Sequence, residues 1–164
     1  MKKLFLTLGG FFIVLLVLGF FFKNQIGKNN SIYTGSKNLT AIVTVAGNPI
    51  RVEIVKSASD KSKGLSNQKY LGEDFGMLFD LQGDDLTHVF WMKDMLIPID
   101  IIWIKDNKVI QIDGDLKAPE PNTPDSDLEK FTPSQDVDFV LEVNAGYVTK
   151  KGIRVGDEFE ILPN

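Results

Sequence analysis

The chain has 164 residues, of which 43% are hydrophobic, and its formal net charge is −4 at pH 7. It contains no cysteine and one histidine, which excludes disulfides, cysteine nucleophiles, a lipidated-cysteine anchor and ordinary structural zinc sites. We therefore predict no metal and no cofactor.

The first predicted element is a membrane-spanning helix over residues 4–22, a run of 19 residues without a charge. A helix of this length can cross a bilayer core of ~30 Å. Lys2 and Lys3 precede the run, which favours a single-pass protein of the cytoplasmic membrane whose C-terminal part is periplasmic or extracellular. The alternative is a cleaved signal peptide. The long run lacks a small-residue cleavage site, which favours an uncleaved anchor over residues 1–22.

Residues 23–37 are rich in Asn, Gly, Ser and Lys and predict a flexible tether, and residues 38–164 fit one compact domain. Five of the 18 basic residues, and none of the 22 acids, lie in residues 1–37. The domain thus carries 18 − 5 = 13 bases against 22 acids, a net charge of −9. This acidity argues against nucleic-acid binding and against a domain that lies flat on anionic lipid.

The domain begins with a predicted β-hairpin, residues 40–45 and 50–55, joined by a turn at Gly47-Asn48-Pro49. Ser57 or Ser59 can cap a short helix that Gly64 ends. Further strands are predicted at 75–79, 89–92, 99–104, 109–112, 138–144 and 158–162. A short helix after residue 145 stops at Gly152, and residues 113–135, with four prolines, predict a long surface loop. The pattern is typical of a mainly-β antiparallel sandwich or barrel with one or two short helices.

Four sequence blocks in this order resemble the domain of unknown function 192 family, and the resemblance covers essentially all of residues 38–164. The blocks are Lys63-Gly64-Leu65 with Leu71; Gly76-Met77-Leu78-Phe79; Phe90-Trp91-Met92-Lys93 with Ile97-Pro98-Ile99-Asp100-Ile101; and the run 140–146 followed by Gly152-Ile153 and Gly156-Asp157. Ser66 and Asp94-Met95 depart from the usual family pattern. The resemblance implies a jelly-roll-like fold and no established activity.

Charged residues inside apolar strands form the candidate site, because such groups are rarely buried without partners. Strand periodicity places Asp100 in an apolar face, where it needs a partner such as Lys93 or backbone N–H groups. The ligand-binding candidates are Trp91, Lys93, Asp100, Glu142 and Asn144. The same residues can instead form a structural cluster that sets the strand register, and the sequence leaves both readings open.

A non-catalytic domain that binds a small polar ligand or an envelope protein is the function we expect. One alternative is a hydrolase of an envelope polymer in which Asp100 and Glu142 act as acid and base. Another is a structural subunit of a membrane complex, packed through Gly9-Gly10 of the predicted helix. The sequence contains no G-x-S-x-G nucleophile motif that His88 could assist as a base. His88 is therefore expected to have a capping or surface role. The acid pairs of residues 113–138 lack EF-hand spacing and indicate a solvated loop.

Overall fold

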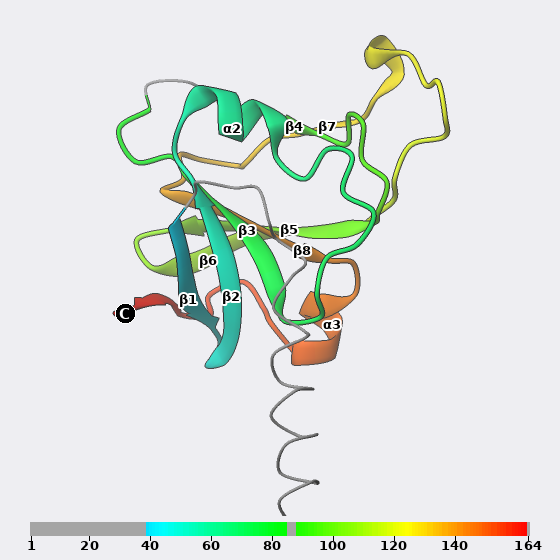
Figure 1. The fold of residues 1–164 in the computed structure, drawn as a ribbon. Coiled ribbons are helices and arrows are strands. Elements are labelled where there is room, and N and C mark those ends of the chain that lie inside the picture. The colour runs from blue at the N-terminus through cyan, green and yellow to red at the C-terminus, as the bar shows by residue number, and fades with distance from the viewer. Residues whose placement is uncertain (1–38, 85–87, 164) are drawn as a thin grey trace, which may run out of the picture. The chain divides into compact units, whose positions relative to one another are not determined.

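One curled sheet contains seven of the nine strands in the described residues, 39–84 and 88–163 of this computed structural model (Figure 1). The strand order is β6-β5-β8-β3-β2-β1-β9, and β4 pairs with β7 in a separate ribbon. The strands are β1 (Leu39–Val45), β2 (Asn48–Val55), β3 (Phe75–Asp80), β4 (Phe90–Trp91), β5 (Ile99–Lys105), β6 (Lys108–Leu116), β7 (Lys130–Phe131), β8 (Phe139–Asn144) and β9 (Phe159–Leu162). The helices are α2 (Ala58–Lys63) and α3 (Tyr147–Lys151), with a 3-10 turn, η1 (Asp125–Asp127).

These elements all belong to the compact unit Asn38–Asn164. The predicted membrane helix and tether, residues 1–37, lie outside the described residues. Within residues 39–84 and 88–163, no helix combines the length and hydropathy needed to cross a membrane.

The predicted first hairpin is confirmed, with β1 antiparallel to β2. Ala46 and Gly47 form its turn with φ values of 51° and 74°. Two consecutive residues with positive φ are typical of a type I′ turn, whose twist matches that of the flanking strands. Because the turn needs only these two residues, β2 begins at Asn48, two positions earlier than the sequence pattern predicted.

The helix predicted after Ser57 is also confirmed. The Ser57 hydroxyl accepts a hydrogen bond from the Asp60 N–H at 3.1 Å, and Gly64 ends α2 with φ 48°. This helix lies in the connection from β2 to β3, and these two strands pair in parallel. The expectation of an antiparallel sheet was therefore wrong at this pair, since α2 and residues 64–74 together carry the chain back before β3 begins.

Both faces of the sheet are buried, by two separate apolar clusters. One cluster lies inside the curl and includes Val43, Leu141 and Phe159. The other lies on the opposite face and includes Phe79, Trp103 and Met95. Figure 1 shows α2, β4 and β7 together above the sheet, and side chains of the second cluster come from this covering layer.

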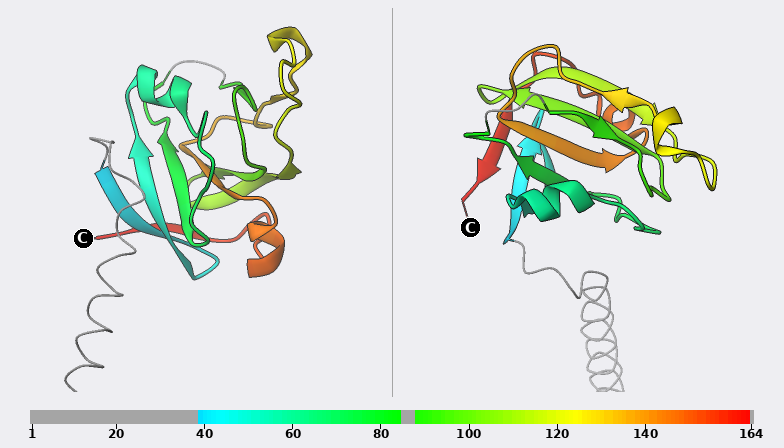
Figure 2. Two further views of the ribbon diagram at one scale, coloured as in Figure 1. Left: turned by 45° about the vertical axis from the view of Figure 1, so that its right-hand side comes forward. Right: turned by 90° about the horizontal axis from the view of Figure 1, so that it is seen from above.

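The sheet curls until its two ends approach each other. β9 pairs with β1, and Glu158 forms an isolated bridge with Lys108 at the start of β6 (Figure 2). The result is a half-barrel with two short helices. The sequence left a sandwich or a barrel open, and the structure has the barrel-like alternative, a seven-stranded sheet that covers its own interior by curvature.

Residues 113–135 are more ordered than the predicted surface loop. β6 continues to Leu116, and β7 pairs with β4 through Phe131 and Phe90. Trp103 Nε1 donates a hydrogen bond to Asp113 Oδ2 at 2.6 Å, which gives this acid a place within a strand. The prolines and acids suggested a loop because the pairings with β5 and β4 are not visible in the composition of the segment itself.

Candidate functional site

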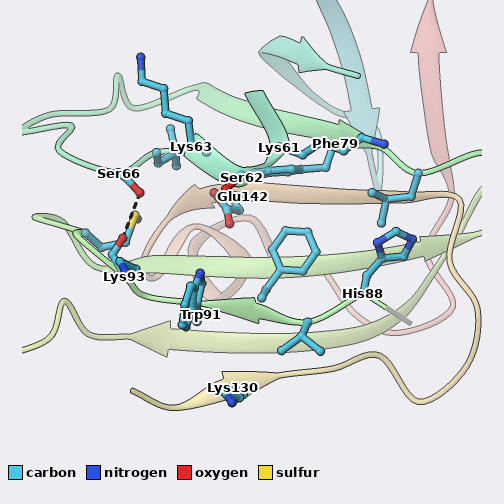
Figure 3. Close-up of a pocket in the computed structure, with 16 residues that line it drawn as sticks. Lys61, Ser62, Lys63, Ser66, Phe79, His88, Trp91, Lys93, Lys130 and Glu142 are labelled. Atoms are coloured by element: carbon cyan, nitrogen blue, oxygen red, sulfur yellow. Dashed lines mark hydrogen bonds between the residues drawn. The ribbon is translucent and has the colours of Figure 1, made fainter. Parts of the chain in front are cut away.

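A pocket of about 520 Å³ lies between the second-cluster face of the sheet and its covering layer (Figure 3). Its volume falls within the range of small-molecule binding sites. The lining includes basic side chains, hydroxyl groups, aromatic rings and one carboxyl group. The residues discussed below are Lys61, Ser62, Lys63, Ser66, Phe79, His88, Phe90, Trp91, Lys93, Lys130 and Glu142.

Glu142 lies at the centre of the pocket in Figure 3. It belongs to β8, where its register partners are Met77 of β3 and Ile101 of β5. Its side chain thus occupies an apolar row, is 6% exposed, and leaves Oε2 without a hydrogen-bond partner among the described residues. Burial raises the pKa of the Glu142 carboxyl to about 8. At neutral pH the group is therefore mostly protonated and can donate a hydrogen bond.

Aromatic rings build one wall of the pocket. Phe79 of β3 and Phe90 of β4 meet edge to face with centroids 5.0 Å apart, and Phe90 meets buried Trp103 in the same way at 5.3 Å. Such pairs stabilise the packing beyond their buried area. Trp91 also lines the pocket but remains 42% exposed. The wall is therefore anchored in the core and offers an aromatic surface to a ligand.

Basic side chains surround the pocket, and they fall into two groups. Lys61 Nζ binds Asp84 Oδ2 at 2.7 Å, and Lys93 pairs with Asp125. The hydrogen bond to Asp125 raises the pKa of Lys93, whose ammonium also lies 5.3 Å from the centroid of the Trp91 ring. Lys63 and Lys130 have no ion pair among the described residues.

Two hydrogen bonds hold the rim of the pocket in place. The Ser66 hydroxyl donates to the Lys93 carbonyl oxygen at 3.0 Å, and the Asn67 N–H donates to the Asp94 carbonyl oxygen at 2.7 Å. Asp94 adopts a left-handed conformation with φ 56°. Ser66 and Asp94 were noted above as departures from the family pattern. Here they join the segment after α2 to the turn after β4.

Asp100 lies away from this pocket, on the other face of the sheet. Its register partner is Val143, a member of the cluster inside the curl. The carboxylate accepts hydrogen bonds from the backbone N–H groups of Asp115, Gly146 and Val148 at 2.8, 3.1 and 2.9 Å. Asp100 thus has the backbone partners that the sequence required. The structure does not bring it together with Lys93 or Glu142.

Asn144 shares a face with Glu142 but lies at the end of β8. Its side-chain amide donates hydrogen bonds to the carbonyl oxygens of Leu71 and Gly72 at 3.1 and 2.9 Å. It lines a separate hollow of about 310 Å³. Of the five predicted site residues, the structure therefore brings together Trp91, Lys93 and Glu142.

The pocket also contains residues that the sequence analysis did not assign to it. Lys61 and Lys63 come from α2, Lys130 from β7 and His88 from the segment before β4. His88 was expected to have a capping or surface role, yet its side chain is only 20% exposed and lines the pocket. The sequence carries no local signal for this set, since its members are joined only by the packing of the covering layer on the sheet.

Comparison with known proteins identifies the family of the chain, but it assigns no activity. Residues 41–161 match the model of the DUF192 family, which is described as "Uncharacterized ACR". No curated protein matches the sequence.

The crystal structures that resemble the chain include the following two. One is a protein of unknown function from Novosphingobium aromaticivorans, with 27% identity and a TM-score of 0.68, over 79% of this chain and 91% of that one. The other, described as "a putative transcription regulator", is from Sinorhizobium meliloti. It has 26% identity and a TM-score of 0.67, over 77% of this chain and 97% of that one.

Proposed function

Since this chain belongs to the DUF192 family, whose description names no activity, we propose its function from the pocket: a non-catalytic domain that binds a small polar ligand. The observation that carries this proposal is the buried carboxyl of Glu142 in the pocket, whose Oε2 has no hydrogen-bond partner among the described residues. We further propose that residues 4–22 anchor the domain at the outer side of the cytoplasmic membrane.

The contrast between Asp100 and Glu142 supports a ligand. Both carboxyl groups are buried in the sheet, with 1% and 6% exposure. Asp100 is satisfied by three backbone N–H groups, so protein structure alone explains its burial. Glu142 Oε2 has no such partner among the described residues, and a buried polar group without a hydrogen bond costs roughly 1–3 kcal/mol. A ligand that supplies the missing partner offsets this cost.

The geometry favours binding over the two-carboxylate hydrolase. That mechanism needs Asp100 and Glu142 on one substrate, but the two residues face opposite sides of the sheet. Glu142 is the one acid among the described residues that line the pocket. A proton donor can orient a ligand, but the pocket lining lacks the second carboxylate that two-carboxylate glycoside hydrolysis uses.

The description of the Sinorhizobium meliloti relative as a regulator of transcription belongs to that protein. The net charge of −9 on residues 38–164 does not favour a DNA-binding role for this chain.

Blocking the pocket tests the proposed function. Full-length protein in lipid nanodiscs is screened by calorimetric melting against neutral, cationic and anionic sugars, peptides and organic acids. A ligand at a hundredfold excess over its Kd stabilises the fold by ~2.7 kcal/mol. Ser62 lines the pocket from an exposed position of α2, so Ser62→Trp is expected to abolish the ligand-induced shift.

Ser59→Trp provides the matched control. Ser59 is exposed on the same helix and is absent from the pocket lining. The ligand-induced shift should survive in this variant. A shift that survives Ser62→Trp would place the ligand elsewhere, and a screen without any hit would remove the support for a small-molecule site.

A further inference from the structure

The polar groups at the floor of the pocket differ in charge from those at its edges, and this difference indicates the class of ligand. At the floor is a single buried carboxyl group, Glu142, and at the edges are the lysines (Figure 3). We propose that the pocket binds a small organic anion whose charged head meets Lys63 and Lys130, while an uncharged oxygen accepts a hydrogen bond from Glu142. This inference rests on the proposed function and names its ligand class.

The rim provides the charge for the anionic head. Lys61 and Lys93 already neutralise Asp84 and Asp125, whereas Lys63 and Lys130 have no ion pair among the described residues. Both side chains are exposed, come from α2 and β7, and lie on opposite sides of the pocket in Figure 3. Long lysine side chains can swing toward a ligand from such positions. They form a local basic rim on a domain with a net charge of −9.

The floor does not suit a charged group. Burial raises the pKa of the Glu142 carboxyl, so a negative charge is disfavoured at this depth. A second negatively charged group of the ligand would lose its hydration at the pocket floor without gaining a partner. A protonated carboxyl group instead offers one O–H donor, which suits a carbonyl, amide or hydroxyl oxygen of the ligand. Charge at the rim and a neutral acceptor at the floor therefore define the two ends of the ligand.

The space between these ends is apolar and aromatic. Phe79, Phe90 and Leu65 line the pocket, and Trp91 presents a ring that is 42% exposed. A flat apolar body can stack on these side chains. The class is therefore a carboxylate or phosphate with a short, partly apolar body and one uncharged oxygen.

Three matched probes separate the elements of this ligand. Hippurate carries a carboxylate, an amide carbonyl and a phenyl ring. Hippuramide lacks the negative charge, and 4-phenylbutyrate replaces the amide by methylene groups. Binding to the full-length protein in nanodiscs is measured by calorimetry at pH 7. Hippurate is expected to bind at least about tenfold more tightly than either relative, which corresponds to about 1.4 kcal/mol. 4-Acetylphenyl phosphate tests whether a phosphate head serves equally well.

Two lysine variants test the rim. The double variant Lys63→Met, Lys130→Met keeps the long side chains and removes both charges. It should weaken hippurate about tenfold and leave hippuramide unchanged. Lys108→Met is the control, because Lys108 is exposed, lies at the start of β6 and does not line the pocket.

The pH dependence tests the floor. The strands beside Glu142 contribute Met77 and Ile101, and the other titratable groups that line the pocket are Lys61, Lys63, His88, Lys93 and Lys130. Loss of the Glu142 proton removes the donor, so hippurate affinity should hold between about pH 7 and pH 8 and fall up to about tenfold per pH unit above pH 8. Glu142→Gln keeps an N–H donor, and its affinity should not change with pH in this range.

Equal affinities for hippurate and hippuramide, or an unchanged affinity in the double lysine variant, would overturn the anionic head. A pH slope that persists in Glu142→Gln would overturn the role of the floor. Absence of binding by all four probes would overturn the ligand class. If neutral or cationic compounds of the broader screen still bind and are blocked by Ser62→Trp, the proposed binding function survives and only this ligand assignment fails.

Discussion

At the scale of single residues, two buried carboxyl groups in neighbouring strands have opposite environments. Asp100 points toward three N–H groups, and Glu142 points toward a pocket. Their strands are paired so that Asp100 faces Val143 and Ile101 faces Glu142. Side chains one position apart on a strand point to opposite faces of the sheet. The pairing of β5 with β8 therefore decides that Asp100 faces backbone N–H groups and that Glu142 faces the pocket.

The burial of Glu142 predicts a pH-dependent stability. Its pKa in the folded state, about 8, lies above its ordinary value of 4.5. The folded protein therefore binds a proton that the unfolded chain releases between these values, and stability should fall as pH rises from about 4.5 to about 8, by at most roughly 1.4 kcal/mol per pH unit. Glu142→Gln should lose this slope and be the more stable protein at pH 8.

Urea denaturation at a series of pH values measures this difference, with the emission of buried Trp103 as the signal. Glu129→Gln, at an exposed position, should retain the slope of the parent protein. Parallel pH profiles for the parent and Glu142→Gln would show that the carboxyl group is solvated in the folded state.

At the scale of elements, Asp100 connects β5, β6 and α3. From β5 it binds the N–H of Asp115 in β6 and those of Gly146 and Val148 at the start of α3. Gly146 has φ 78° at this start, a conformation that glycine adopts without a Cβ penalty. The carboxylate thus caps the first turn of α3 and fixes its position against the sheet.

Asp100→Asn should destabilise the domain without affecting the pocket directly. The asparagine side chain has one acceptor oxygen for the three backbone N–H groups. Its own NH₂ group would lie against these donors and could not accept from them. Hydrogen bonds to charged groups contribute about 1.5–3 kcal/mol each, so the expected loss is about 3 kcal/mol or more in urea denaturation. Asp136→Asn, at an exposed position, is the control. A loss below about 0.5 kcal/mol, the usual range of surface substitutions, would contradict this capping role.

At the scale of the whole domain, curvature replaces a second sheet. β9 closes the interior by pairing with β1, and Phe159 from β9 packs against Phe139 with ring centroids 5.5 Å apart. Phe159 is 1% exposed. The last strand therefore seals the cluster inside the curl, while the covering layer of α2, β4 and β7 leaves the pocket open on the other face.

Phe159→Ala should destabilise the whole domain by about 3 kcal/mol, since it leaves a cavity among residues that the curvature holds in place. Ile161→Ala on the same strand is the matched control, because Ile161 is 44% exposed. Calorimetric melting of the full-length variants gives the comparison. Equal losses in both variants would mean that β9 contributes edge pairing and little to the core.

Several features were predictable from the sequence because their causes are local. The first hairpin follows from β-branched residues around Gly47, and α2 from Ser57 and Gly64 as its caps. The strand at Phe139–Asn144 and the helix that ends at Gly152 were recognised in the same way. The four sequence blocks also predicted the family, which the match over residues 41–161 confirms. The domain boundaries and the membrane anchor stay predictions.

Only the tertiary structure decided the register, the curl and the pocket. The parallel pairing of β2 with β3 has no local signature, because a buried strand has the same apolar pattern in either orientation. Lys63, Lys130 and Glu142 meet at one pocket through long-range packing. The sequence by itself determined that charged groups lie within apolar strands. The face that each strand presents after pairing decided which of these groups found backbone partners and which lines the pocket.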